Sequence, residues 1–339
     1  MNNTKNVLVI GGAGYVGAVL VPKLLDAGHK VTVLDLYMYG DDVFDTVRNH
    51  KNLIQVKGDI RNLDAVKKSL VECDSVIHLA CISNDPSFEL DPDLGRSINL
   101  DSFTPIVREA KKAGVTLFIY ASSSSVYGIK NEANVTEDLS LEPLTDYSKF
   151  KMITEELLMQ ERNENFSTCI IRPATVCGYS PRQRLDVIVN ILTNHAVNTG
   201  KIKILGGEQL RPNIHIEDIT DLYSLILNTE HSKIDGKIYN AGFFNHKVLD
   251  IGLAVKEVVE QSDKNLHSNI ELIIEESNDN RSYHISSEKI KNELNFEPKH
   301  SLKDAITDIL TAFDRGLLPN SMYEKKYFNI RTMQEQKLK

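Results

Sequence analysis

The chain has 339 residues, of which 41% are hydrophobic, and its formal net charge at pH 7 is −8. This length predicts one large or two closely joined domains, and the apolar content argues against disorder. Acidic and basic residues are interspersed without a basic stripe, so we expect no nucleic-acid partner. The polar start and the short apolar run behind it predict neither a signal peptide nor a membrane span, and therefore a cytoplasmic protein.

The first predicted element is a buried strand over residues 6–10, followed by a glycine-rich turn and a helix over 14–27. The glycines at positions 12, 14 and 17 fit a dinucleotide fingerprint: glycine permits a tight turn, a close backbone approach to pyrophosphate and close packing of helix on strand. The start of the helix offers free N–H groups and a partial positive charge to the phosphates. The cofactor contacts expected from this turn are Gly11, Gly14, Tyr15, Val16 and Gly17.

The second predicted strand, over residues 31–35, ends at Asp35. This acidic residue lies about 20 residues beyond the glycines, where the adenosine ribose of a dinucleotide is expected. A carboxylate at this place accepts hydrogen bonds from both ribose hydroxyls and repels a 2′-phosphate. The sequence therefore predicts NAD rather than NADP as cofactor.

Up to about residue 180, apolar strands alternate with amphipathic helices, which predicts an α/β fold: a doubly wound parallel sheet, or Rossmann fold, with helices on both faces. Beyond it we expect a smaller α/β domain, with the chain crossing back at least once. The domains expected are 1–180, 181–320 and a polar tail, 321–339. The predicted strands are 6–10, 31–35, 53–57, 75–79, 116–120, 168–172, 203–205, 238–241 and 271–275; the predicted helices are 14–27, 63–71, 98–113, 146–162, 184–199, 217–228, 248–261, 286–294 and 301–314.

Two further stretches carry polar groups that fit an active site. Four serines, residues 122–125, follow the strand at 116–120, and ligands of doubly wound sheets bind beyond the carboxyl ends of strands. Tyr147 and Lys151 are four residues apart and share one face of a helix. A neighbouring ammonium favours the phenolate, which makes tyrosine a usable general base. Each stretch taken alone also has an ordinary structural explanation: serine clusters are common in loops, and a tyrosine four residues before a lysine is typical of a solvent-exposed helix face.

Taken together, these motifs resemble the extended short-chain dehydrogenase/reductases, specifically the NAD-dependent nucleotide-sugar epimerase/dehydratase group. Further residues that carry the resemblance are Gly58-Asp59-Ile60, His78-Leu79-Ala80, Asn99 and the run from Arg211 to Asp218. The resemblance implies that Ser123, Tyr147 and Lys151 are catalytic. It implies further cofactor contacts at Asp59, Ile60, Leu79, Ala80, Asn99 and Pro173, besides Tyr147 and Lys151.

The resemblance also implies substrate contacts. Arg211 and Arg281 match arginines that grip the substrate diphosphate, for which bidentate guanidinium–phosphate bonding is the physical reason. His215 is expected to be structural, and Asp218 to be a helix N-cap. The other expected substrate contacts are Ser124, Ser125, Thr175, Arg184 and Asn190; for Arg184 and Asn190, a solvated arginine and a helix-surface asparagine are equally open readings.

Family 4,6-dehydratases carry an acidic pair directly after the catalytic serine or threonine, whereas this chain has Ser124 and Ser125 there, which disfavours dehydration. We therefore expect a nucleotide-sugar 4-epimerase of surface-polysaccharide biosynthesis, acting on a nucleotide-diphosphate sugar. A C4 dehydrogenase or 4-keto reductase, acting on a substrate such as a GDP-heptose, stays open, because residues 180–190 resemble a subgroup with that activity. A non-catalytic NAD-binding partner protein is a third hypothesis.

Helices 98–113 and 146–162 resemble a family dimer interface, which predicts a homodimer. The four cysteines form no close pair, so we expect no metal site and no disulfide.

Overall fold

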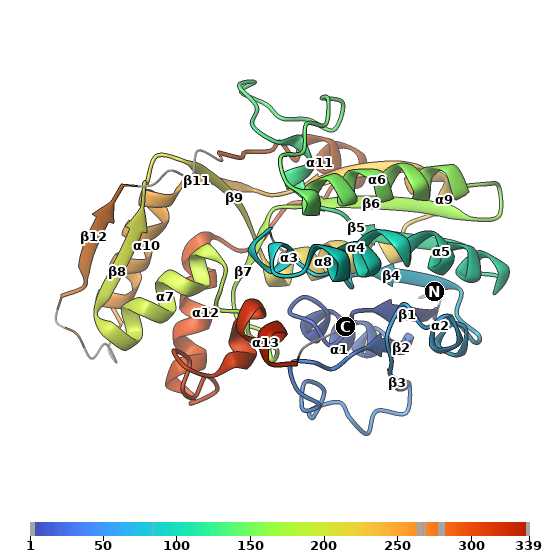
Figure 1. The fold of residues 1–339 in the computed structure, drawn as a ribbon, viewed down its shortest axis with the longest axis horizontal. Helices are drawn as coiled ribbons and strands as arrows, with labels where there is room; N and C mark the ends of the chain where they lie inside the picture. The colour runs from blue at the N-terminus through green and yellow to red at the C-terminus, as the bar shows by residue number, and fades with distance from the viewer. Residues whose placement is uncertain (1–3, 84, 263–266, 268, 277–281, 337–339) are drawn as a thin grey trace.

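A computed structural model describes residues 4–83, 85–262, 267, 269–276 and 282–336. Its largest sheet has seven strands in the order β10-β6-β5-β4-β1-β2-β3, and every neighbouring pair is parallel (Figure 1). The strand order reverses between β1 and β4, which is the switch point where doubly wound folds bind ligands. The predicted Rossmann-like sheet is therefore confirmed. Its strands are β1 (Asn6–Ile10), β2 (Lys30–Asp35), β3 (Leu53–Lys57), β4 (Ser75–His78), β5 (Leu117–Ala121), β6 (Ser167–Pro173) and β10 (Lys237–Ala241).

Helices cover both faces of this sheet because its strands are apolar on both sides. In β1, Val7 and Val9 join one buried cluster and Leu8 and Ile10 join the other, since successive side chains of a strand point in opposite directions. Helices α1 and α8 pack on the first cluster, and α2, α5 and α6 on the second. Their bounds are α1 (Gly17–Asp26), α2 (Leu63–Ser69), α5 (Phe103–Lys112), α6 (Asp146–Glu161) and α8 (Ile216–Asn228); shorter helices are α3 (Asp85–Glu89), α4 (Pro92–Arg96), α9 (His231–Ile234) and α11 (Glu288–Leu294).

The second half of the chain builds two small sheets and a separate helical layer, at the left of Figure 1. Strands β11, β9 and β7 form one sheet, and β12 and β8 form the other. Helices α7, α10 and α12 enclose a further apolar cluster. The bounds are β7 (Thr175–Cys177), α7 (Ile188–Thr199), β8 (Lys201–Leu205), β9 (Leu210–His215), β11 (Phe244–Lys247), α10 (Val248–Glu260), β12 (Glu271–Glu275), α12 (Leu302–Asp314) and α13 (Asn329–Gln336).

The predicted starts of two helices differ most from the structure. The helix predicted over 98–113 starts with a π-helical turn, Ser97–Asp101, before α5 begins at Phe103. The helix predicted from residue 184 begins only at Ile188, because Val187 is extended, with φ −113° and ψ 150°. Residues 184–187 therefore form a loop that lies beside the main cavity.

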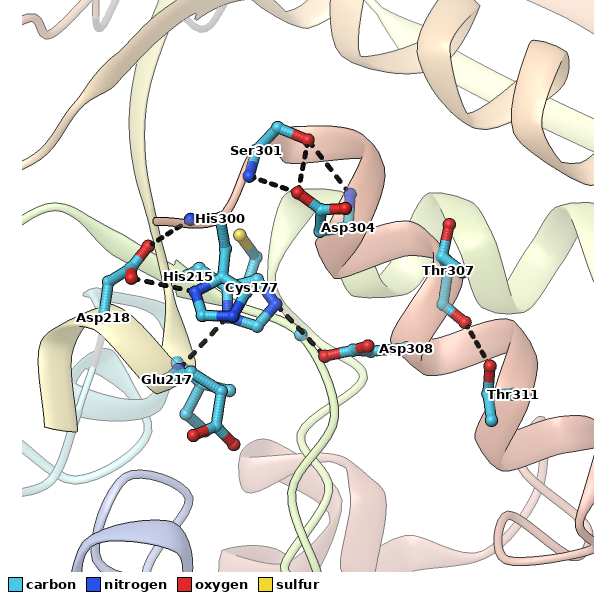
Figure 2. Close-up of polar contacts among 12 residues, drawn as sticks. Cys177, His215, Glu217, Asp218, His300, Ser301, Asp304, Thr307, Asp308 and Thr311 are labelled. Atoms are coloured by element: carbon cyan, nitrogen blue, oxygen red, sulfur yellow. Dashed lines mark hydrogen bonds and ion pairs between the residues drawn. The ribbon is translucent and has the colours of Figure 1, made fainter. Parts of the chain in front are cut away.

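The prediction that Asp218 caps a helix is wrong. Helix α8 is capped by His215, whose Nδ1 accepts a hydrogen bond from the Glu217 backbone N–H at 3.1 Å. Figure 2 shows that Asp218 instead accepts hydrogen bonds from the segment before α12: its carboxylate binds the backbone N–H groups of Lys299 and His300 and the His300 ring. These contacts fasten the start of α12, which belongs to the separate helical layer, to α8, which packs on the main sheet.

The C-terminal tail folds onto the rest of the protein. A 3-10 turn, Lys325–Tyr327, precedes α13, and Asn329, Thr332 and Met333 are buried. Met333 packs into the same apolar cluster as α2, α5 and α6. Within the ranges described, no helix is both long and apolar enough to cross a membrane.

Candidate active site

The glycine-rich turn between β1 and α1 owes its shape to close backbone packing. Gly11 has φ +80°, and a Cβ there would lie 2.5 Å from the backbone nitrogen of Ala80. A Cβ on Gly17 would lie 2.2 Å from the carbonyl oxygen of Gly12. Only glycine fits at these places, so the turn brings the first N–H groups of α1 to the end of β1.

Asp35 at the end of β2 braces this turn. Its Oδ2 accepts a hydrogen bond from the Ala13 N–H at 2.9 Å, and its Oδ1 accepts one from the Tyr37 N–H at 2.8 Å. Burial raises the pKa of Asp35, while these two hydrogen bonds favour the carboxylate. The same side chain lines the cavity, so its carboxylate is positioned both to hold the turn and to face a bound ligand.

The predicted catalytic residues come from two elements that meet at the carboxyl end of β5. Ser123 caps the 3-10 turn Ser124–Tyr127, and its Oγ lies 2.9 Å from Ser125 Oγ. Tyr147 lies in the first turn of α6, and Lys151 follows one turn later.

The ammonium of Lys151 is held firmly. Its side chain is only 3% exposed, and Nζ donates a hydrogen bond to the Ala121 carbonyl at 2.7 Å. Nζ also lies 5.9 Å from the centroid of the Tyr147 ring and 4.8 Å from that of Tyr120. Burial acts to lower the pKa of Lys151, but the neighbouring Cys81, Tyr120 and Tyr147 outweigh it, so the pKa is raised and the side chain stays charged.

One cavity of about 550 Å³ joins these groups. It runs from the end of β2, past the glycine-rich turn, to the serines and the start of α6, and this size is typical of sites for organic ligands. Most of the predicted site residues line it: Gly11, Gly14, Tyr15, Val16, Gly17, Asp35, Asp59, Ile60, Leu79, Ala80, Ser123, Ser124, Ser125, Tyr147, Lys151, Pro173, Thr175, Arg184 and Arg211.

Comparison with known proteins agrees with this geometry. The profile of the "NAD dependent epimerase/dehydratase family" matches residues 7–242. This chain belongs to that family. A UDP-glucose 4-epimerase of Lactobacillus helveticus is 26% identical over 325 residues, covering 88% of this chain and 94% of the relative. UDP-arabinose 4-epimerase 1 of Arabidopsis thaliana is 27% identical over 334 residues, covering 89% of this chain and 77% of the relative.

A solved structure gives the same picture. The UDP-glucuronic acid 4-epimerase of Bacillus cereus, in complex with UDP-glucuronic acid and NAD, superposes with a TM-score of 0.80 at 25% identity, covering 91% of this chain and 99% of that one. NAD is the cofactor of the family. The cavity of this family member suits it, because an acidic residue, a glycine-rich turn and a buried ammonium follow one another along its wall.

Two of the predicted contacts do not line the cavity. Asn190 is fully buried: its Nδ2 donates hydrogen bonds to Tyr15 Oη and the Arg184 carbonyl, and its Oδ1 accepts one from the Gly178 N–H. Asn190 therefore joins the loop before α7 to the glycine-rich turn. It does not reach the cavity, so the prediction that it contacts the substrate is wrong.

Asn99 acts in a similar way at the other side of the cavity. Its side-chain amide donates to the Ile82 carbonyl and accepts from the Ile82 N–H, at 2.9 and 2.8 Å. Ile82 lines the cavity, so Asn99 shapes the wall from behind and does not reach the space itself.

On the substrate side, two arginines reach the cavity. Arg184 Nε donates to Asp186 Oδ1 at 2.6 Å, and Arg211 lies with its guanidinium carbon 5.5 Å from the centroid of the Tyr283 ring. Arg281, the second predicted diphosphate ligand, lies outside the described residues. Nowhere in the described chain do three or more His, Cys, Asp or Glu side chains gather as a metal site would need.

A buried polar network lies beneath the predicted catalytic residue Ser123. Glu155 of α6 pairs with Arg172 of β6, with 2.6 Å between Oε2 and Nη2, and both side chains are almost fully buried. Glu155 also accepts a hydrogen bond from Ser122, and Arg172 donates to Tyr127 Oη at 2.7 Å. The network therefore holds Ser122 and Tyr127, the residues at the two ends of the run 123–126.

Sequence reasoning missed a group of residues at the end of the cavity near Asp35. Because the adenosine of NAD is expected there, we call it the adenosine end. Tyr39, Arg182, Asn329 and Met333 all line the cavity there. Arg182 lies in the 180–190 segment that the sequence singled out, but Asn329 and Met333 belong to the tail. No local pattern in a polar tail shows which of its residues face a ligand.

Proposed function

We propose that this chain oxidises C4 of a nucleotide-diphosphate sugar and, as a 4-epimerase, returns the hydride to the opposite face of that carbon. One observation carries the proposal: Ser123, Tyr147 and Lys151 line the same cavity as the glycine-rich turn. The three relatives described above support it, since each is named as a sugar-nucleotide 4-epimerase.

NAD, when bound, supplies a hydride acceptor and donor. The chain supplies the proton transfer: Tyr147, as phenolate, removes the proton of the C4 hydroxyl, because the ammonium of Lys151 favours the charged form of the phenol. Ser123 donates a hydrogen bond to the C4 oxygen as negative charge develops on it. Lys151 also hydrogen-bonds the nicotinamide ribose, as the family resemblance implies.

Epimerisation requires the sugar to turn over while the rest of the substrate stays bound. Arg211, and Arg281 by resemblance, would hold the diphosphate with bidentate bonds during this motion. Ser124 and Ser125 stand where 4,6-dehydratases carry an acidic pair, so this chain has no acid and base there for the elimination of water. We assign the product to surface-polysaccharide biosynthesis, and the active form to a cytoplasmic homodimer with α5 and α6 at its interface; both stay predictions from the sequence.

The test is incubation of the purified protein with a panel of sugar nucleotides, followed by absorbance at 340 nm and product NMR. An isomerised product without a net change in absorbance supports the epimerase. Reduced cofactor accumulating together with a 4-keto product would instead establish the C4 dehydrogenase, which uses the same catalytic residues.

A matched pair of variants tests the role of the phenol. Tyr147→Phe removes one hydroxyl and should lower kcat about 10²- to 10⁴-fold without loss of NAD binding. Tyr323→Phe, at a tyrosine that is 83% exposed, should leave kcat unchanged. If Tyr147→Phe keeps full turnover, the role assigned to the phenol is wrong. If none of the sugar nucleotides reacts with the wild-type protein, the non-catalytic NAD-binding hypothesis is supported instead.

A further inference from the structure

The C-terminal helix α13 closes the adenosine end of the cavity. Figure 1 shows it beside the N-terminal elements, although more than 240 residues separate Asn329 from Ser83 in the sequence. Asn329 makes three hydrogen bonds to two other segments: its backbone N–H donates to Asp186 Oδ2, its Nδ2 donates to Ser83 Oγ, and its Oδ1 accepts from Arg182 Nη2, at 2.9, 2.8 and 2.6 Å. One side chain of the tail therefore bridges the loops that follow β4 and β7.

Arg182 is the unusual member of this group, because in the described part of the chain no carboxylate forms an ion pair with its buried guanidinium. Its residue is 4% exposed, and its guanidinium stacks on Tyr39 with 3.4 Å between Cζ and the ring centroid. Nε is buried and has no hydrogen-bond partner among the residues that the structure describes. The nearby carboxylate of Asp186 is already engaged by Arg184 and by the N–H of Asn329.

A guanidinium keeps its charge even in such a place, so the arrangement calls for an anion from outside the chain. Arg182 lines the cavity, and its charge acts on Asp35, which places it at the adenosine-ribose end. The anion of NAD that lies next to this ribose is the diphosphate, only one methylene group away. The glycine-rich turn offers N–H groups to that diphosphate, but the segment from Val7 to Gly17 contains no lysine or arginine.

We propose that Arg182, oriented by Asn329 of the C-terminal helix, binds the diphosphate of NAD, and that the tail thereby retains the dinucleotide through turnover. The proposal rests on the NAD-dependent activity proposed above. Its chemistry is a charge-assisted contact between the phosphates and the guanidinium of Arg182, which lines the cavity and whose Nη2 is held in place by Asn329. A 2′-phosphate is not favoured as the ligand, because it would have to lie beside the Asp35 carboxylate.

The test measures binding, so it does not depend on turnover. Calorimetry with adenosine, ADP and NAD separates the contribution of the phosphates from that of the nucleoside. Arg182→Gln should weaken the binding of ADP and NAD about 10- to 100-fold, since a hydrogen bond to a charged group is lost, and should leave the binding of adenosine unchanged. Asn329→Ala should raise the rate of NAD release from the purified holoprotein, measured by ultrafiltration and chromatography of the remaining nucleotide.

Three controls keep the outcome clear. Arg315→Gln removes an exposed arginine, and Gln334→Ala changes an exposed residue of α13; neither should alter ADP binding. Arg182→Lys keeps the charge and should retain part of the affinity, with unchanged adenosine binding showing that the variant is folded.

Other patterns would overturn the proposal. Equal weakening of adenosine and ADP would make Arg182 a structural residue. A loss confined to NADP, or to UDP as a probe of the substrate diphosphate, would assign the guanidinium to a different phosphate. If Arg182→Gln weakens ADP binding as expected but the wild-type protein turns over no sugar nucleotide, the diphosphate site is supported and only the proposed 4-epimerase activity is wrong.

Discussion

The buried ion pair of Glu155 and Arg172, beneath the predicted catalytic residue Ser123, allows a quantitative test of how the fold supports the site. Glu155→Ala removes the carboxylate that accepts hydrogen bonds from Arg172 and Ser122. The side chain of Arg172 is 3% exposed, so its charge would be left buried without a counter-ion, although Tyr127 would still accept one hydrogen bond. Loss of one partner from a buried pair costs about 3–5 kcal/mol, and we expect that decrease in the free energy of unfolding.

Urea unfolding of the nucleotide-free protein measures this decrease without a contribution from ligand binding. Glu156→Ala is the matched control, because it changes the next residue of α6, which is exposed, and should alter stability by no more than about 0.5 kcal/mol. The double variant Glu155→Met/Arg172→Met should recover much of the loss, since no charge then stays buried. If the free energy of unfolding of Glu155→Ala falls by less than about 1 kcal/mol, or by no more than that of Glu156→Ala, the buried pair does not stabilise the fold as expected.

Three further predictions concern the turn, the cofactor and pH. Gly17→Ala should lower the free energy of unfolding in urea by roughly 3 kcal/mol or more, because the new Cβ would collide with the Gly12 carbonyl. Gly28→Ala should lower it by only about 1–2 kcal/mol, because no atom lies within 4 Å of its Cβ and only the positive φ opposes alanine. Calorimetry should find NAD bound more tightly than NADP, and Asp35→Asn should reduce that preference; tighter binding of NADP to the wild type would contradict the assigned role of Asp35. Burial, assisted by Lys151, lowers the pKa of His78 from 6.5 to about 3. As the pH falls, the imidazole of His78 is protonated in the unfolded chain before it is protonated in the folded protein. The stability that neutral His78 contributes is therefore complete above pH 6.5 and decreases by about 4–5 kcal/mol as the pH falls toward 3. His78→Phe should remove that part of the pH dependence of urea unfolding, and an unchanged pH profile would count against the prediction.

Much of the fold could be predicted because its signals are local. The strands of the main sheet are short apolar runs, and the glycine-rich turn carries its constraints in its own residues, as the close contacts of Gly11 and Gly17 show. Asn190 illustrates the limit: a polar residue on a predicted helix reads as solvent-facing, yet its amide bonds to Tyr15, 175 residues away.

The same limit explains why Arg182 and Asn329 were missed at the adenosine end of the cavity. The bond between Arg182 and Asn329 spans 147 residues, and that between Asn329 and Ser83 spans 246. Such contacts exist only after the two halves of the chain have packed together, so no window of sequence contains both partners. The tail residues then gain a role that their own neighbours in the sequence do not indicate.

The docked tail also bears on which reaction the catalytic residues complete. Tyr147, Lys151 and Ser123 would perform the same proton transfer in an epimerase and in a C4 dehydrogenase, so these residues cannot separate the two. The difference lies in competing rates: the hydride returns to the sugar if it does so before the reduced cofactor leaves, and net oxidation results if the cofactor leaves first. A helix that bridges the loops around the cofactor cavity and orients a buried cation there slows departure, which favours return of the hydride. On this argument, weakening the Asn329 contacts should shift an epimerase toward accumulation of the 4-keto sugar while leaving the first hydride transfer unchanged.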